Sequence, residues 1–211
     1  MNKPVKTIIV LITLLCVCVS TLVFFTNTKV TRNLYDKKEH LWYRDERYLP
    51  PTPIAPTANG KQCFWSRGNG WAIAALARII NALPKTDPHR QEYINTFKET
   101  AAALAKCQPS DGIWRVSLYD PNQYPTYESS GTLLDTYAIA WGINNGYLDK
   151  KPYYTGVAKA WNATVKKCIG TNGFVGYVQV QADDPSMGQN KLSSLSTEEY
   201  GYGAVLLAEV S

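Results

Sequence analysis

The chain is poor in the residues that most often bind metals or form disulfide frameworks. It contains two histidines and five cysteines in 211 residues. Cys16 and Cys18 lie inside an N-terminal apolar run, and the remaining three, Cys63, Cys107 and Cys168, are far apart. No C-x-x-C pair is present outside that run, and the 16–18 spacing is too tight for zinc. The pattern argues against a metal site and against a disulfide framework, while one bridge among the three stays open without an assignment.

Charge is also scarce and is never concentrated. Charged residues make up 18% of the chain, the formal net charge is +5, and the longest basic runs are the pairs Lys37-Lys38 and Lys166-Lys167. Nucleic-acid-binding proteins gather basic residues in a stripe or tail, so we expect no nucleic-acid partner. The chain also lacks a G-x-G-x-x-G fingerprint, a Walker loop and β-α-β alternation. The mild positive bias suits an anionic substrate such as a uronic acid, and it is common among other proteins too.

Aromatic residues, by contrast, are plentiful. They form 12% of the chain and include six tryptophans and 14 tyrosines. Flat apolar ring faces match the C–H faces of pyranose sugars, although such residues serve equally well in an ordinary core.

One uncharged segment stands at the N-terminus. Residues 7–28 carry no charge, residues 8–25 are almost wholly apolar, and Lys3 and Lys6 precede them. The run is longer than a usual signal-peptide core and lacks a small-residue cleavage site, so we expect a signal anchor rather than a cleaved signal peptide in residues 1–28. A single domain would follow in 29–211, and the protein would be membrane-anchored or secreted to the periplasm. Lys29 and Arg32 after the run leave the orientation open.

The rest of the chain shows helical periodicity. Leu76, Ile79, Ile80 and Leu83 repeat at i, i+3, i+4 and i+7 after Gly70, which predicts a helix that ends at Pro84. Similar patterns predict helices over 93–104, 133–141, 153–165 and 200–209. A short strand pair is expected through 177–180. The fold class is therefore all-α, with long loops that present a site.

The most distinctive stretch is FWSRGNGW at 64–71. Its glycines would let the backbone turn tightly just before the first helix, which places Asn69 near a helix N-terminus where anions are favoured. Arg67 offers a planar fork suited to a carboxylate, and Trp71 lies one helical turn later. The alternative is a plain helix start with a buried tryptophan and a surface arginine.

This motif closely resembles the signature of the unsaturated rhamnogalacturonyl and glucuronyl hydrolases of glycoside hydrolase families 105 and 88. The resemblance continues in order along 34–211, in the blocks LWYRDERYLPP (41–51), CQPSDGIWRVSLYDP (107–121), YESSGT (127–132), AIAWGINNGYLD (138–149), KAWNATV (159–165), GFVGYVQ (173–179) and EEYGYGAVLLAEV (198–210). It implies an (α/α)6 toroid, of which this chain would form about half behind an N-terminal hydrophobic helix.

The resemblance also implies a reaction. The substrate would be an oligosaccharide from a lyase-degraded, pectin-like or uronate-containing polysaccharide, with a 4,5-unsaturated uronic acid at its non-reducing end. Water adds across the double bond, and the resulting hemiketal collapses and releases the sugar. A carboxylic acid with a raised pKa can protonate the alkene carbon and then accept a proton from water. No metal or organic cofactor is implied.

Site residues follow by position in the matching blocks. Arg67 and Trp71 are expected to contact substrate, with Asn69 and Glu128 as further substrate-binding candidates. Arg44 stands where better-studied relatives have a histidine, and this departure puts the substrate subtype in doubt. For Glu128 a structural role is at least as well supported.

The catalytic residue has no assignment, because no block matches the family's catalytic aspartate, which lies in the other half of the toroid. The best remaining acids are Asp45, Glu128 and the pair Asp183-Asp184, and the pair is expected to lie in a solvated loop. A truncated hydrolase or half of a homodimer would fit this pattern. The alternatives are a membrane-anchored, non-catalytic carbohydrate-binding remnant and a structural helical protein.

Overall fold

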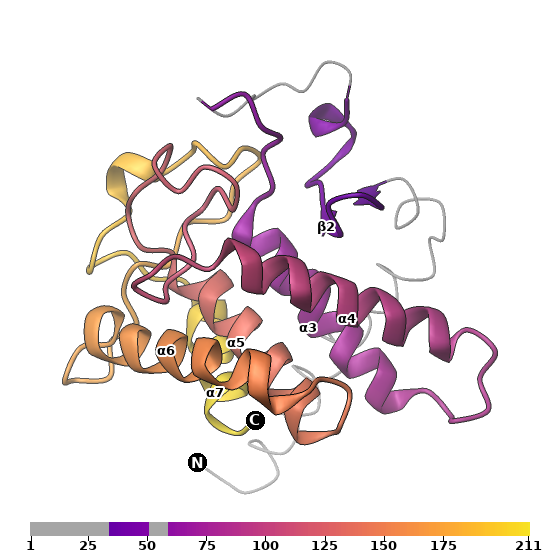
Figure 1. Ribbon diagram of the computed structural model, residues 1–211. Coiled ribbons are helices and arrows are strands. Elements are labelled where there is room, and N and C mark those ends of the chain that lie inside the picture. The colour runs from indigo at the N-terminus through magenta and orange to yellow at the C-terminus, as the bar shows by residue number, and fades with distance from the viewer. Residues whose placement is uncertain (1–33, 51–58) are drawn as a thin grey trace, which may run out of the picture.

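The computed structural model describes residues 34–50 and 59–211, and within them the protein is predominantly helical (Figure 1). Its described helices are α3 (Ser66–Ala82), α4 (Arg90–Cys107), α5 (Ser129–Asn144), α6 (Lys150–Cys168) and α7 (Glu199–Glu209), with short 3-10 turns η1 (Glu46–Tyr48) and η2 (Gln189–Lys191). Each of the five α-helices matches a helix expected from the apolar periodicity, so the prediction of these helices is confirmed. The expected hydrophobic helix within 1–28 lies outside the described residues.

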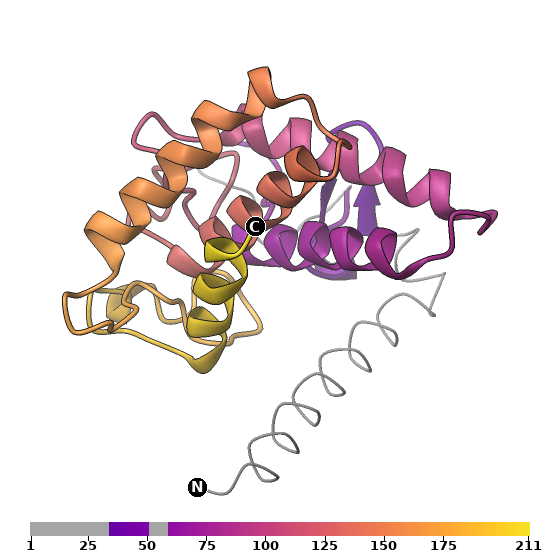
Figure 2. The same ribbon diagram turned by 90° about the horizontal axis from the view of Figure 1, so that it is seen from below.

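The helices form two layers. Figures 1 and 2 show α3, α5 and α7 in one layer and α4 and α6 in the other. Helix α5 lies at the centre, where it packs against α3, α6 and α7. Its sequence explains this position, because Asp135 is its only charged residue and apolar or small residues occupy every side. An element without a polar face has to be covered all round.

Two glycines set the contact between α3 and α5. A Cβ added to Gly70 would lie 3.0 Å from the Cβ of Leu134 and 3.1 Å from the carbonyl oxygen of Gly131. A Cβ on Gly131 would lie 2.5 Å from the Oγ of Ser66. The expected tight turn before the helix is therefore wrong, since α3 already begins at Ser66 and these glycines serve close helix packing instead.

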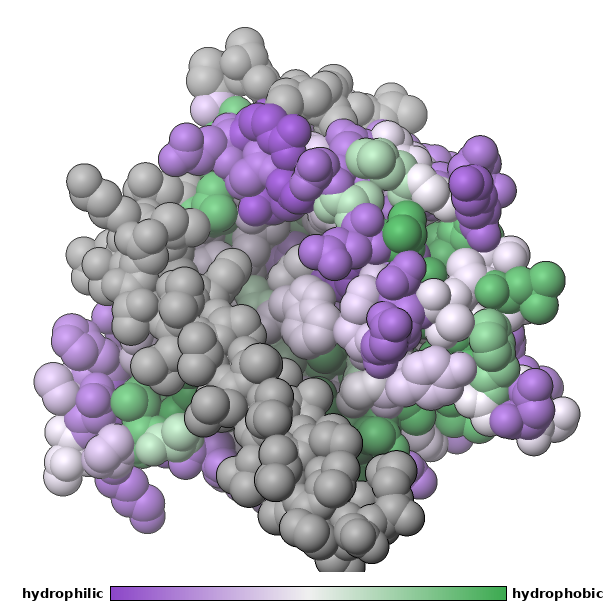
Figure 3. All heavy atoms as spheres, turned by 180° about the vertical axis from the view of Figure 1, so that it is seen from behind, coloured by the Kyte–Doolittle hydropathy of each residue, from purple (hydrophilic) through white to green (hydrophobic). Residues whose placement is uncertain are grey.

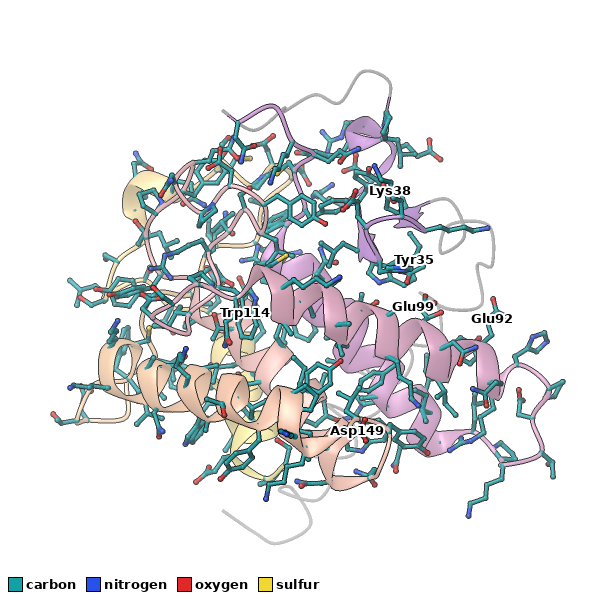
Figure 4. All side chains as sticks on the ribbon, in the orientation of Figure 1. Tyr35, Lys38, Glu92, Glu99, Trp114 and Asp149 are labelled. Carbon is teal, nitrogen blue, oxygen red and sulfur yellow. The ribbon has the colours of Figure 1, made fainter. Side chains whose placement is uncertain are left out.

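A small hairpin precedes the helices. Strand β1 (Tyr35–Asp36) pairs antiparallel with β2 (Leu41–Trp42), with Tyr35 opposite Trp42. Figure 4 shows Tyr35 directed toward Glu99 of α4, and the Tyr35 hydroxyl donates to the Glu99 carboxylate at 2.9 Å. The backbone of Trp42 is bound by Asn69 of α3. These contacts hold the hairpin against both helices. No alternation of polar and apolar residues in the sequence predicted it.

Two long loops lie next to each other at one end of the helices. Residues 108–128 join α4 to α5, and residues 169–198 join α6 to α7. Trp65, Val116 and Leu192 form a small apolar cluster between them. The expected strand pair through 177–180 is wrong, because these residues form no strand. Tyr177 has a left-handed φ of 57°, and the amides of Tyr177 and Val178 donate to the carbonyl oxygens of Ser193 and Ser196 of the same loop.

Three further observations concern the cysteines, metal binding and membrane spanning in the described part of the chain. Cys63, Cys107 and Cys168 are all free thiols. Within 34–50 and 59–211 no group of three or more His, Cys, Asp or Glu side chains is placed to hold a metal ion. No helix in these ranges combines the length and apolarity needed to cross a bilayer.

Candidate functional site

A pocket of about 450 Å³ opens where the hairpin, the first turns of α3 and the loop after α6 meet. Its wall is aromatic and basic, and it consists of Leu34, Trp42, Tyr43, Arg44, Trp65, Arg67, Gly68, Trp71, Ala72, Gln181 and Ala182. Three of the residues expected to contact substrate, Arg44, Arg67 and Trp71, thus come together in one place. Their contact with a substrate stays a prediction.

Arg67 is the most constrained cation in this wall. It is 6% exposed, and its guanidinium donates to the carbonyl oxygens of Gln179 at 2.6 Å and Val180 at 3.1 Å. The same group lies 4.7 Å from the ring centre of Trp65 and 5.4 Å from that of Tyr200. No carboxylate of the described residues lies within ion-pair distance of it. A buried guanidinium without a counter-charge favours an anion as ligand.

Gln179 holds this arrangement together. Its side-chain oxygen accepts from the indole nitrogen of Trp65 at 2.9 Å, and its side-chain nitrogen donates to the carbonyl oxygens of Pro185 and Met187. Its backbone oxygen accepts from both Arg67 and the Tyr200 hydroxyl. One buried glutamine therefore fixes the positions of Trp65 and Arg67 from a loop more than a hundred residues away.

Arg44 is the second cation of the wall, and it is already paired. Its guanidinium bonds to the carboxylates of Asp45 and Asp183 and donates to the carbonyl oxygen of Ala182. Asp45 in turn accepts a bidentate pair of bonds from Arg47, which lowers the pKa of this carboxyl to about 2. The network fastens residues 44–47 to the loop after α6.

The acidic pair in that loop takes part in the same fastening. Asp183 is exposed, as expected for a solvated loop, but it bonds to Arg44. The carboxylate of Asp184 accepts from the Tyr48 hydroxyl at 2.9 Å and from Ser186. Hydrogen bonds to Ser186 and Tyr48, set against partial burial, leave the pKa of Asp184 below its usual value.

The tryptophans differ in exposure. Trp65 is buried beneath the two arginines, whereas Trp71 is 44% exposed and makes an edge-to-face contact with Tyr200 at 6.2 Å. Trp71 therefore combines a partly exposed ring with a place in the pocket wall, which suits contact with the apolar face of a sugar.

Asn69 and Glu128 lie behind the wall rather than in it. The Asn69 amide bonds to the backbone of Trp42 and Trp65, so its polar atoms are occupied. The buried carboxylate of Glu128 caps α5 through the amides of Ser130 and Gly131, and it also accepts from the backbone amide of Gln179. Both residues hold elements that carry the pocket.

Three residues of the arrangement were not foreseen. Trp42 and Trp65 lie inside the blocks LWYRDERYLPP and FWSRGNGW, each two residues before an arginine of the pocket. That spacing was a signal from which their place in the pocket wall could have been predicted. Gln179 also lies in a matching block, GFVGYVQ, but the block gives no sign of its role, which depends on contacts across the fold. No Asp, Glu or His belongs to the part of the pocket wall that the described residues form.

Comparison with known proteins agrees with this architecture. The model of Glycosyl Hydrolase Family 88 matches residues 23–211. The chain is 41% identical over 177 residues to an unsaturated 3S-rhamnoglycuronyl hydrolase of Formosa agariphila. The aligned region covers 83% of this chain and 46% of that protein. A hydrolase of the same name from an Alteromonas species is 39% identical over 175 residues and is covered to 40% of its length. The chain thus spans less than half the length of these curated relatives.

Solved structures extend the match to the fold. A glycosyl hydrolase family 88 protein from Bacteroides vulgatus superposes with a TM-score of 0.79 at 41% identity, over 86% of this chain and 51% of that one. The expected all-α, partial (α/α)6 fold is therefore confirmed for the described helices. With its family model, its relatives and its fold in agreement, the chain belongs to glycosyl hydrolase family 88.

Proposed function

We propose that the protein binds the unsaturated uronic-acid end of an oligosaccharide in the pocket around Arg67 and, as a glycoside hydrolase, hydrates the 4,5 double bond and so releases the sugar. The observation that supports this proposal most directly is the Arg67 guanidinium, which is buried in the pocket wall and has no carboxylate partner among the described residues. A uronate carboxylate supplies the missing negative charge in a planar shape that matches the guanidinium.

The pocket gives each part of such a ligand a counterpart. Two of the five guanidinium N–H donors of Arg67 are fixed on backbone carbonyls, which sets the plane of the fork and leaves donors for the ligand. Trp71 offers an exposed ring to the apolar face of the sugar. Binding energy from both contacts would orient the double bond for attack by water.

The names of the relatives support this substrate class. The curated proteins from Formosa agariphila and the Alteromonas species are both unsaturated 3S-rhamnoglycuronyl hydrolases. For the present chain we propose the wider class, namely unsaturated uronic-acid-terminated oligosaccharides from lyase-degraded polysaccharides.

Hydration needs one proton on an alkene carbon and a hydroxyl, taken from water, on its neighbour. A carboxylic acid can deliver the proton and recover one from the water. The part of the wall formed by described residues contributes anion binding and stacking but no such acid. The roles derived for Arg67 and Trp71 are therefore binding and orientation.

That observation also favours a second candidate, a membrane-anchored protein that binds the same sugar without turning it over. The apolar segment in residues 1–28 would provide the anchor, and release of the protein from membranes by alkaline carbonate would contradict it. Secretion to the periplasm after cleavage is the other localisation that the segment permits.

One experiment separates the two candidates. The full chain is incubated with an unsaturated uronic-acid disaccharide while the ultraviolet absorbance of the double bond and the heat of binding are recorded. Loss of absorbance that is abolished in Arg67→Ala supports the hydrolase, and binding without loss of absorbance supports the second candidate. Arg115→Ala is the matched control, because Arg115 is a partly buried arginine that is paired with Asp111 and does not line the pocket. Absence of both signals contradicts the proposed site.

A further inference from the structure

Helix α6 carries more positive charge than any other described helix. It contains five lysines and no acidic residue, which gives its side chains a formal charge of +5, the same as the net charge of the whole chain. No basic run in the sequence is longer than two residues, so it is the helix that collects these lysines on one element. Figure 1 shows α6 in the layer that it shares with α4.

Three of these lysines lie on one exposed face. Lys151, Lys159 and Lys166 are all exposed and are separated by eight and seven residues, which is close to two helical turns each time. Thr155 and Asn162, also exposed, lie between them at spacings of three or four residues. These five residues form a line, here called the α6 stripe. In it, cations about 12 and about 11 Å apart along the helix axis alternate with neutral hydrogen-bonding side chains.

The lysines of the stripe have no carboxylate partner among the described residues. All 17 acidic residues of the chain lie in the described ranges, and none comes within 4.0 Å of Lys151, Lys159 or Lys166. Lys167 beside them differs, because it pairs with Asp111 at 3.5 Å. Lys151 also lies in the first turn of α6, where the helix dipole disfavours a cation and no acid compensates. A face of unpaired cations is complementary to an external anion.

The composition of the stripe narrows the kind of anion. Figure 3 shows the face of the molecule opposite α4 and α6, where hydrophobic residues in green are interspersed with hydrophilic residues in purple. The α6 stripe, in contrast, contains no apolar side chain to insert into a lipid surface. It also lacks the arginines that bind phosphates in two places and the rings on which bases stack, so it does not fit a nucleic acid.

We propose that the α6 stripe binds a strand of uronate-containing polysaccharide. The carboxylates of the strand would pair with the lysines, and its hydroxyl groups would hydrogen-bond to Thr155 and Asn162. The proposal rests on the proposed function in that its ligand is the polymer whose lyase products the pocket would take. None of the five residues lines the pocket around Arg67, so the stripe is a second site that would hold the protein on the polymer.

Calorimetric titration of the full chain with polygalacturonate, in a mild nonionic detergent that solubilises its apolar N-terminal run, tests this proposal. The expected result is binding that weakens as salt is added, with no binding of neutral dextran. The triple variant Lys151→Gln, Lys159→Gln, Lys166→Gln should raise the dissociation constant about 30-fold, because each exposed ion pair contributes about threefold. Glutamine has nearly the helix propensity of lysine, so the variant should keep its fold.

A second triple variant is the matched control. Lys85→Gln, Lys98→Gln, Lys106→Gln removes the same charge from exposed lysines in and beside α4, and it should leave the dissociation constant nearly unchanged. Equal losses in the two triple variants would show a general effect of charge and overturn the proposal, as would the absence of binding to polygalacturonate. Tighter binding to phosphatidylglycerol vesicles than to polygalacturonate would overturn it in favour of a lipid surface.

Two further titrations separate the stripe from the pocket. The α6 variant should bind the unsaturated disaccharide as the wild type does, and Arg67→Ala should bind polygalacturonate as the wild type does. Polymer binding that is lost in Arg67→Ala and kept in the α6 variant would place the polymer in the pocket and overturn the stripe. A protein that does not bind the disaccharide, yet loses the polymer only in the α6 variant, would contradict the proposed function and support the stripe.

Discussion

At the residue scale, the two arginines of the pocket differ in what already balances their charge. Arg44 bonds to two carboxylates, those of Asp45 and Asp183. Arg67 bonds to two carbonyl oxygens and lies over aromatic rings, with no carboxylate partner in the part of the chain that is described. The charge of Arg44 is therefore balanced by the loop that it holds, whereas the charge of Arg67 is available to a ligand.

The matched substitutions Arg67→Gln and Arg44→Gln should therefore have unequal effects. We expect Arg67→Gln to weaken binding of a uronic-acid disaccharide by about 100-fold, since a charge-assisted bidentate contact contributes about 3 kcal/mol. Arg44→Gln should weaken it less than tenfold, because only the position of the loop changes. Calorimetric titration of both variants measures this difference, and equal losses would show that Arg44 also carries ligand charge.

At the scale of elements, the contact between α3 and α5 determines where the pocket residues stand. Gly70 and Gly131 allow the two helices to approach at the turn that carries Arg67. Glu128 caps α5 at the same end and reaches the backbone of Gln179, which in turn accepts from Arg67. The packing of α3 against α5 therefore also determines where the Arg67 guanidinium lies.

Gly131→Ala tests this contact. Its Cβ would lie 2.8 Å from both the backbone nitrogen of Arg67 and the carboxylate of Glu128, so overpacking should cost about 1–3 kcal/mol of unfolding free energy. Gly203→Ala in α7 is the control, because nothing lies within 4 Å of its Cβ. There alanine should stabilise the helix by about 0.5–1 kcal/mol. Denaturant unfolding of both variants decides, and a neutral Gly131→Ala would contradict the close approach.

At the scale of the whole molecule, the central helix carries a buried acid that the fold leaves without a partner. Asp135 is fully buried, and neither carboxyl oxygen has a hydrogen-bond partner in the described structure. Burial, and after it the negative charge of Glu128, raises the pKa of this carboxyl well above its ordinary value. The neutral acid is therefore the form that the folded core accepts.

This sets a direction for stability against pH. Because the folded pKa is raised, the contribution of Asp135 is fully present below the unfolded pKa of about 3.9 and is lost progressively as the pH rises above it. Asp135→Asn should remove this decline, so the free energy of unfolding of the variant should gain on the wild type as the pH rises above about 4. The exposed Glu209→Gln should follow the wild-type curve. Parallel curves for all three proteins would show that Asp135 ionises freely.

Much of this architecture could be predicted from the sequence, and the reason is local. The helices from α3 to α7 follow from apolar residues at helical spacing, and Pro84 ends the first because it cannot continue the ladder after Leu83. The family follows from ordered blocks around FWSRGNGW. Arg44, Arg67 and Trp71 were singled out from those blocks, and the structure places all three at one pocket.

The remainder depends on contacts between distant segments, which no local pattern contains. The hairpin at 35–42 has strands too short to show a period, so only docking on α3 and α4 reveals it. The glycines of the motif look like turn residues until α5 is seen packed against them. Gln179 acquires its role from Arg67 and Trp65, which lie 112 and 114 residues away. Sequence alone thus determined the helices and the family, while tertiary packing decided which polar groups are used up inside the protein and which charge is left for a ligand.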